Sequence, residues 1–86
     1  MTVEEAVRLF EANKVPEWRY TVGGLGGGEC EGVDYLNGKW IVYYSERGKR
    51  RRIEEFDSEA EAVSCWVERV DRGLKGAEGR NLDRTE

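Results

Sequence analysis

The chain has 86 residues, of which 38% are hydrophobic and 37% charged, and its net charge is −4. A chain of this length forms one small domain. Because it contains no histidine, the sequence excludes Ser-His-Asp and Cys-His catalysis and any His-ligated zinc or haem site. Its two cysteines cannot close a four-thiolate metal site. We therefore expect no metal and no cofactor, and a protein that acts by binding rather than as an enzyme.

The compartment follows from the cysteines and the N-terminal sequence. Cys30 and Cys65 form no disulfide framework, and the first residues lack the basic and apolar regions of a signal peptide. No apolar run approaches the roughly 20 residues that a membrane span needs. The sequence therefore predicts a cytoplasmic protein with reduced thiols and no membrane contact.

A helix is predicted over residues 2–13. Thr2 and Glu5 form a capping box at its start. Pro16 disfavours helical backbone at the residue before it, so the helix must end upstream. The apolar side chains that recur at helical spacing are Val3, Ala6, Val7 and Phe10.

Strand-like segments and turn signals follow this helix. The sequence GGLGGG at 23–28 is too rich in glycine for a regular element and predicts a mobile loop. Asn37-Gly38 is a two-residue hairpin signal, and residues 46–49 supply a second turn. The strands are predicted at residues 17–22, 30–36, 39–45 and 50–56, and the last has the polar character of an edge strand.

The last predicted helix starts at a second capping box, formed by Ser58 and Glu61, and is expected to stop at Gly73. Residues 74–86 show no periodicity and are expected to be a flexible tail outside a domain of residues 1–73. The order α-β-β-β-β-α predicts an α+β fold. Its economical form is an antiparallel meander of three to four strands with both helices packed on one face.

The net charge conceals an uneven distribution. Residues 37–52 carry six basic groups and one acidic group, whereas residues 1–36 and 53–72 carry net charges of −4 and −5. The basic groups could contact RNA or another anion, or they could protect an edge strand while paired with Glu54, Glu55 or helix carboxylates. Because the whole chain is acidic, we favour edge protection or a protein contact over nucleic acid. The basic set is Arg47, Lys49, Arg50, Arg51 and Arg52.

The stretch from Gly38 to Gly48 (GKWIVYYSERG), followed by Phe56-Asp57-Ser58-Glu59, resembles one group of small immunity proteins that accompany polymorphic toxins in bacteria. Members of that group are also similar in a glycine-rich turn and an acidic strand, here Glu29-Cys30-Glu31-Gly32. The resemblance covers about residues 16–72. It implies a protein that binds a cognate toxin stoichiometrically and neutralises it.

The resemblance also implies where such a partner would bind. An acidic surface suits a toxin with a basic active site, because complementary fields speed association. The expected partner-binding residues are Glu31, Asp34, Tyr35, Glu46, Arg47, Glu54 and Glu55. The alternative is a small RNA- or anion-binding module that uses the basic set from Arg47 to Arg52. The polar edge strand favours a monomer or a weak homodimer.

Overall fold

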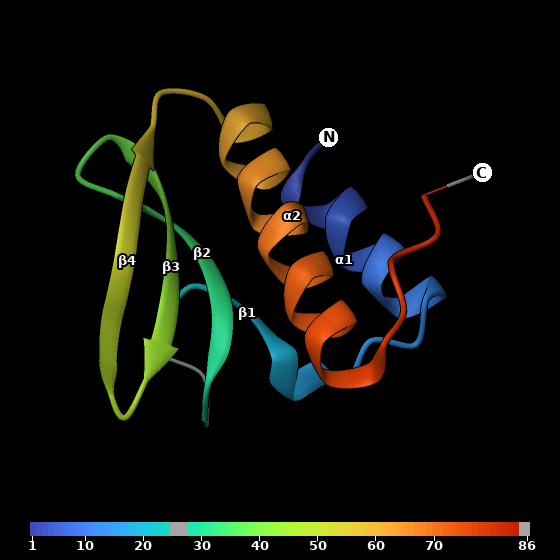
Figure 1. The fold of residues 1–86 in the computed structure, drawn as a ribbon. Helices are drawn as coiled ribbons and strands as arrows, with labels where there is room; N and C mark the ends of the chain where they lie inside the picture. The colour runs from blue at the N-terminus through green and yellow to red at the C-terminus, as the bar shows by residue number, and fades with distance from the viewer. Residues whose placement is uncertain (25–27, 85–86) are drawn as a thin grey trace.

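The computed structural model describes residues 1–24 and 28–84 (Figure 1). The α+β class and the predicted order α-β-β-β-β-α are confirmed. Residues 25–27 of the predicted glycine loop, and residues 85–86, lie outside the described residues. The elements are α1 (Val3–Ala12), a 3-10 turn η1 (Glu17–Arg19), β1 (Tyr20–Val22), β2 (Cys30–Leu36), β3 (Lys39–Glu46), β4 (Lys49–Phe56) and α2 (Glu59–Glu78).

Both helices begin at the capping residues that the sequence predicts. The Thr2 hydroxyl accepts a hydrogen bond from the Glu5 amide at 3.1 Å, and the Glu5 carboxylate accepts one from the Thr2 amide at 2.8 Å. The Ser58 hydroxyl accepts a hydrogen bond from the Glu61 amide at 3.2 Å. These bonds satisfy amides that have no partner within the helix.

The sheet contains four strands in the order β1-β2-β3-β4. The pairs β2–β3 and β3–β4 are antiparallel, as predicted, but β1 runs parallel to β2, with Tyr20 opposite Glu31. The expectation of an antiparallel meander is therefore wrong at β1. The predicted first strand is also shorter, because residues 17–19 form η1. Tyr20 packs against Phe10 with ring centroids 4.8 Å apart, and such tertiary packing sets strand direction, which periodicity does not encode.

Two tight turns and one bulge shape β3 and β4. Asn37-Gly38 and Arg47-Gly48 have positive φ at both positions, as two-residue hairpin turns require. The register between β3 and β4 shifts between Val42 and Tyr44, where Arg52 also has a positive φ of 52°. Arg52 therefore lies in a bulge that divides β4 into two regular halves.

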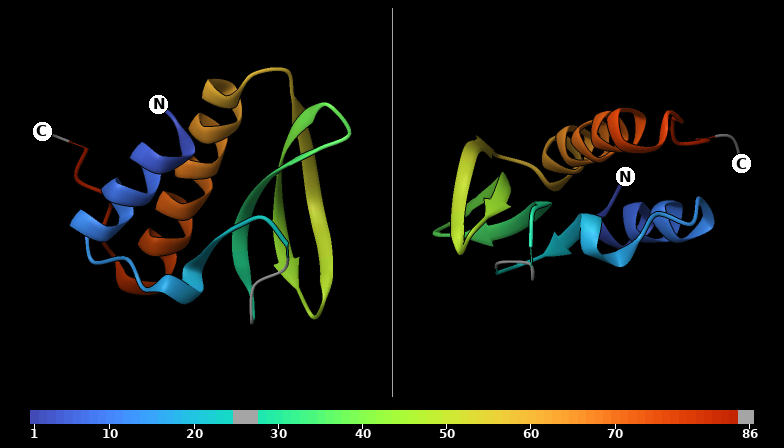
Figure 2. Two further views of the ribbon diagram at one scale, coloured as in Figure 1. Left: turned by 180° about the vertical axis from the view of Figure 1, so that it is seen from behind. Right: turned by 60° about the horizontal axis from the view of Figure 1, so that its bottom comes forward.

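The core lies mainly between the sheet and α2, and α1 packs against α2 and Tyr20 rather than across the strands (Figures 1 and 2). Trp66 of α2 is fully buried, and its ring meets that of Phe10 edge-on at 5.0 Å. Its indole N–H donates to the Glu31 carbonyl at 3.0 Å. Burying an aromatic side chain of this size contributes about 2–3 kcal/mol, so Trp66 is the main link between the two helices and β2.

The sheet face away from α2 is covered by Tyr43, which is fully buried. Its ring lies directly over Gly32, where a Cβ would overlap the ring atoms. The Arg50 guanidinium stacks 4.4 Å from the Tyr43 ring centroid and pairs with Asp34 at 2.8 Å. The Tyr43 hydroxyl donates a hydrogen bond to the Gly24 carbonyl. Glycine at position 32 is therefore a packing requirement.

Helix α2 continues past Gly73 to Glu78, so the predicted end at Gly73 is wrong. Leu74 continues the buried stripe of the helix and is fully buried. Burying it contributes about 2 kcal/mol, which outweighs the cost of about 1 kcal/mol for a glycine inside a helix. The helix ends at Gly79, which has a left-handed φ of 69°.

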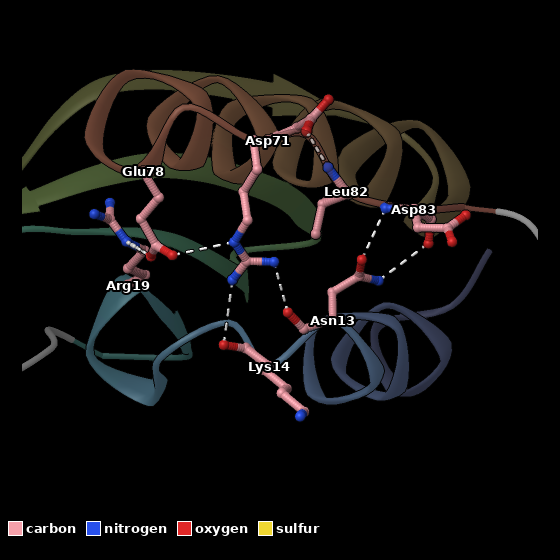
Figure 3. Close-up of polar contacts among 8 residues, drawn as sticks. Asn13, Lys14, Arg19, Asp71, Glu78, Leu82 and Asp83 are labelled. Atoms are coloured by element: carbon pink, nitrogen blue, oxygen red, sulfur yellow. Dashed lines mark hydrogen bonds and ion pairs between the residues drawn. The ribbon is translucent and has the colours of Figure 1, made fainter.

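The segment after α2 packs back on the domain (Figure 3). The Leu82 amide donates to Asp71 at 2.7 Å, and the Asp83 amide donates to the Asn13 side chain at 2.8 Å. Arg80 donates to the Asn13 carbonyl at 2.8 Å, and the Leu82 side chain is buried. Residues 74–84 are thus part of the folded domain, which corrects the predicted boundary at residue 73.

Candidate binding groove between α2 and the sheet

A groove runs along α2 where the helix crosses the ends of β2 and β3 and the middle of β4. It consists of two adjoining hollows of about 520 Å³ and about 430 Å³ that share Glu31, Arg69 and Gly73. We call it the Arg69 groove. The first hollow is also lined by Arg52, Ile53, Glu54 and Arg72, and the second by Trp18, Arg19, Glu29 and Tyr44 among others.

Arg69 connects the elements around this groove, although only 8% of its surface is exposed. Its Nη2 donates to the Arg52 carbonyl at 2.8 Å and to Glu54 at 2.7 Å. Its Nη1 lies 3.8 Å from Oε1 of Glu31, which is an ion pair without a hydrogen bond. A single guanidinium therefore ties α2 to the bulge of β4 and to the start of β2.

Buried polar atoms without hydrogen-bond partners are concentrated here. Within residues 1–24 and 28–84, four buried side-chain polar atoms have no such partner. Three of them belong to residues that line the groove, namely Arg19 Nε, Glu31 Oε1 and Arg69 Nη1. Each of the three nevertheless lies at ion-pair distance from an opposite charge: Glu31 Oε1 and Arg69 Nη1 are 3.8 Å apart, and Arg19 Nε lies 3.6 Å from Glu78 Oε2. The groove therefore holds buried charged groups that are paired by charge but not by hydrogen bonds.

The electrostatics of the groove combine both signs. Burial raises the pKa of the Glu31 carboxyl above its ordinary value, and the neighbouring Arg69, Arg52 and Arg72 act in the opposite direction. Burial opposes the charge of Arg69, but its hydrogen bond to Glu54 and its proximity to Glu31 raise the pKa of the guanidinium. The groove thus holds carboxylates and arginines close together, a pattern suited to a partner with charges of both signs.

Exposed apolar side chains border the groove. Trp18 is 65% exposed and stacks with the Arg19 guanidinium 4.7 Å from its ring centroid. Ile53 is 51% exposed, and Arg52 lies 5.4 Å from the ring centroid of Tyr44. Exposed tryptophan, tyrosine and arginine are the residues that most often dominate binding at protein interfaces.

The seven partner-binding residues predicted from the sequence do not form one surface. Glu31 and Glu54 meet at Arg69, as described above. Asp34 and Glu55 lie on the opposite face of the sheet, because both are paired in register with Ile41. Their position is incompatible with a single interface that also includes Glu31.

The other three predicted partner residues lie at the two ends of the sheet. Tyr35 is exposed near the β2–β3 turn, and its ring packs 5.0 Å from that of Trp40. Glu46 and Arg47 lie at the β3–β4 turn. Of the seven, only Glu31 and Glu54 therefore belong to the groove.

The basic set is also divided between surfaces. Arg50 pairs with Asp34 on the face away from α2, and Arg52 lines the groove. Arg51 is opposite Tyr44 on the α2 side, while Arg47 and Lys49 lie at the turn. The expected partners of these arginines, Glu54, Glu55 or helix carboxylates, are wrong for Arg50, because it pairs with Asp34 of β2.

Sequence reasoning missed Trp18, Arg69 and Arg72. Trp18 was assigned to a strand, whereas it lies in η1 and points outward. Arg69 follows the buried Trp66 by three positions, which places it beside the apolar stripe of α2. That spacing is a signal for a buried arginine, but it does not reveal the carboxylates that meet it.

Other classes of site are not found in the part of the chain that the structure describes. Residues 1–24 and 28–84 contain no group of three or more His, Cys, Asp or Glu side chains that could hold a metal ion. No helix in these ranges is long and apolar enough to cross a membrane. Cys30 and Cys65 are not joined by a disulfide.

No family model, curated protein or solved structure matches the chain. The functional interpretation of the Arg69 groove therefore rests on its own geometry and on the residues around it.

Proposed function

We propose that the chain is an immunity protein that binds a cognate bacterial toxin domain stoichiometrically and neutralises it through the Arg69 groove. The observation that supports this proposal is the mixed-charge groove around the Glu31–Arg69 ion pair, which is bordered by exposed Trp18 and Arg72. A protein partner can supply donors to Glu54, whose side chain is 58% exposed, and acceptors to exposed Arg72 at the same time. Binding alone would block the toxin, without turnover by this chain.

The mixed charge of the groove favours a protein over RNA. A phosphate backbone would gain contacts with Arg52 and Arg72 but would be repelled by Glu29, Glu31 and Glu54. A protein surface can pair charges of both signs, which gives specificity against wrong partners.

Some of the residues that carry the resemblance to immunity proteins line or adjoin the groove, and others lie at the far end of the sheet. Tyr44 lines it directly, and Glu46 and Arg47 follow in the adjoining turn. Ser58 caps α2, and Asp57 pairs with Lys39, so these two residues fix the connection between β4 and the helix. On this proposal, the residues shared with immunity proteins maintain the arrangement of β3, β4 and α2 that positions Arg69.

The direct test is to titrate the chain against the toxin domain encoded beside its gene. We expect toxin activity to fall linearly and to end near one equivalent of added chain. Toxin activity that is unchanged by an equimolar or larger amount of chain would overturn the proposal.

One observation favours a second candidate, the RNA- or anion-binding module. Arg47, Lys49 and Arg51 have no ion-pair partner within the described chain and are exposed. Gel-shift titrations with RNA at several salt concentrations test it. Binding with a steep salt dependence that is lost in a variant with alanine at positions 47, 49 and 51 would support this candidate over toxin binding.

A further inference from the structure

Strand β4 is an open edge of the sheet. It has eight residues, and most of their side chains are exposed. The other edge, β1, has only three residues, and its Tyr20 packs against Phe10 of α1. An edge of this length presents a row of backbone groups that can pair with another strand.

We infer that two copies of this chain associate by antiparallel pairing of their β4 strands. The β4 sequence Lys49–Phe56 is KRRRIEEF, basic in its first half and acidic in its second. A two-fold axis between Arg52 and Ile53 places Arg51 opposite Glu54 of the second copy, and Arg50 opposite Glu55 of the second copy. Each of these pairs occurs twice, so the strand is complementary to itself in charge.

The bulge at Arg52 makes this register geometrically possible. Residues opposite each other in an antiparallel pair must project from the same face of the sheet. In a regular strand, Arg51 and Glu54 would face opposite sides, because they are three positions apart. Here the bulge lies between them, and they pair with Tyr44 and Val42, which lie on the same face.

The second charge pair satisfies the same condition on the other face. Arg50 and Glu55 are in register with Ser45 and Ile41, both of which face away from α2. In the dimer, the bulges of the two strands lie opposite each other. The residues on either side of the bulge therefore keep the same pairing register. The exposed Ile53 would then be covered near the axis.

Charged side chains on β4 are able to form ion pairs with the β4 strand of a second copy. Arg51 and Glu55 have no ion pair within the described chain, and Glu54 contacts Arg69 through Oε1 only. The Arg52 carbonyl is occupied by Arg69, so pairing is confined to the two flanking halves. Short, charged flanks predict a weak dimer whose population depends on concentration and salt.

Sedimentation velocity from about 10 µM to about 1 mM chain at low salt is the primary test. We expect a monomer–dimer equilibrium, and Glu55→Arg should raise the dimer Kd by about ten-fold or more. Glu11→Arg is the matched control, because it makes the same charge change on exposed α1, away from β4 (Figure 1). A monomer throughout the range, or equal Kd values for the two variants, would overturn the inference.

Amide hydrogen exchange of the unmodified chain locates the interface without any substitution. Protection of residues 49–56 should increase with chain concentration, whereas protection confined to another segment would contradict β4 pairing. Glu55 lies outside the Arg69 groove, so failure of the dimer leaves the proposed toxin binding unaffected and separately testable.

Discussion

Arg69 Nη1 and Glu31 Oε1 face each other at 3.8 Å in the buried part of the groove, and neither atom makes a hydrogen bond within the described chain. The separation is an ion-pair distance but exceeds that of a hydrogen bond. At Glu31 burial outweighs this attraction, because the pKa of its carboxyl is raised above the ordinary value. This relationship between α2 and β2 is the basis of the functional proposal, and it makes specific stability predictions.

Replacing Glu31 with glutamine should change how stability depends on pH. Burial raises the pKa of folded Glu31 above its ordinary value of 4.5, so the folded state holds this proton more tightly than the unfolded state. The resulting stability is present below about pH 4.5 and is lost as pH rises through the folded pKa. Urea unfolding should therefore show that Glu31→Gln gains stability relative to the original chain between about pH 4 and pH 7. If the difference in unfolding free energy between the two chains stayed constant with pH, or changed in the opposite direction, the raised pKa of Glu31 would be contradicted.

Replacing Arg69 with methionine should destabilise the fold by about 3 kcal/mol or more, because Glu31 and Glu54 lose their shared partner. Adding Glu31→Met to this variant should restore part of the loss, since the buried carboxylate is then absent as well. Arg72→Met is the matched control, and it should change the free energy of unfolding by less than about 0.5 kcal/mol because Arg72 is exposed. Equal effects at positions 69 and 72 would show that Arg69 does not organise the groove.

Gly32→Ala should destabilise the chain by about 2 kcal/mol or more, because the new Cβ would overlap the Tyr43 ring. Gly76→Ala makes the same chemical change within α2, at a position with nothing close by. There, alanine should stabilise the helix by about 0.5–1 kcal/mol. Thermal unfolding of the two variants should thus shift in opposite directions, and a shared direction would contradict the packing of Tyr43 on Gly32.

Ending the chain at Gly79 should lower its stability by about 2 kcal/mol, which corresponds to a fall in Tm of about 8–16 °C. The truncation removes the buried Leu82 and the hydrogen bond from its amide to Asp71. An unchanged Tm would show that the segment after α2 contributes nothing to the fold.

The same truncation should have a smaller effect in acid. The Leu82 amide, with Asn81 and Arg84, holds the pKa of Asp71 below its ordinary value of 3.8. The stability that this interaction provides is present above about pH 3.8 and is lost as pH falls through the lower folded pKa. The difference in unfolding free energy between the full and shortened chains should therefore narrow below about pH 3.8.

The features that the sequence predicts correctly are local ones. The capping box at Thr2, the cap at Ser58 and the turn at Asn37-Gly38 depend on residues a few positions apart, and the structure contains all three, although at Ser58 only the bond from the Glu61 amide to the Ser58 hydroxyl of the predicted box is formed. The direction of β1 depends instead on Tyr20 meeting Phe10 and Trp66. Such contacts join distant segments, so no local pattern encodes them.

The end of α2 likewise depends on a tertiary contact that the local sequence does not reveal. Gly73 is a typical helix-terminating residue, but the burial of Leu74 favours continuation of the helix past it. In the groove, Glu31 and Glu54 are among the partner-binding residues that the resemblance to immunity proteins implies. Arg69 and Trp18 are not, because their roles depend on the rotation of α2 and on η1 replacing a strand.

The measurement that tests the central claim most directly is calorimetric titration of the neighbouring toxin domain with three forms of the chain. The original chain should bind with a stoichiometry of one to one. Trp18→Ala and Arg72→Glu together should raise Kd by about 100-fold, since both residues line the Arg69 groove and are exposed. Glu11→Arg should leave Kd unchanged. Absence of binding, or an equal Kd for the groove variant and the control, would contradict the assignment of the groove as the toxin-binding surface.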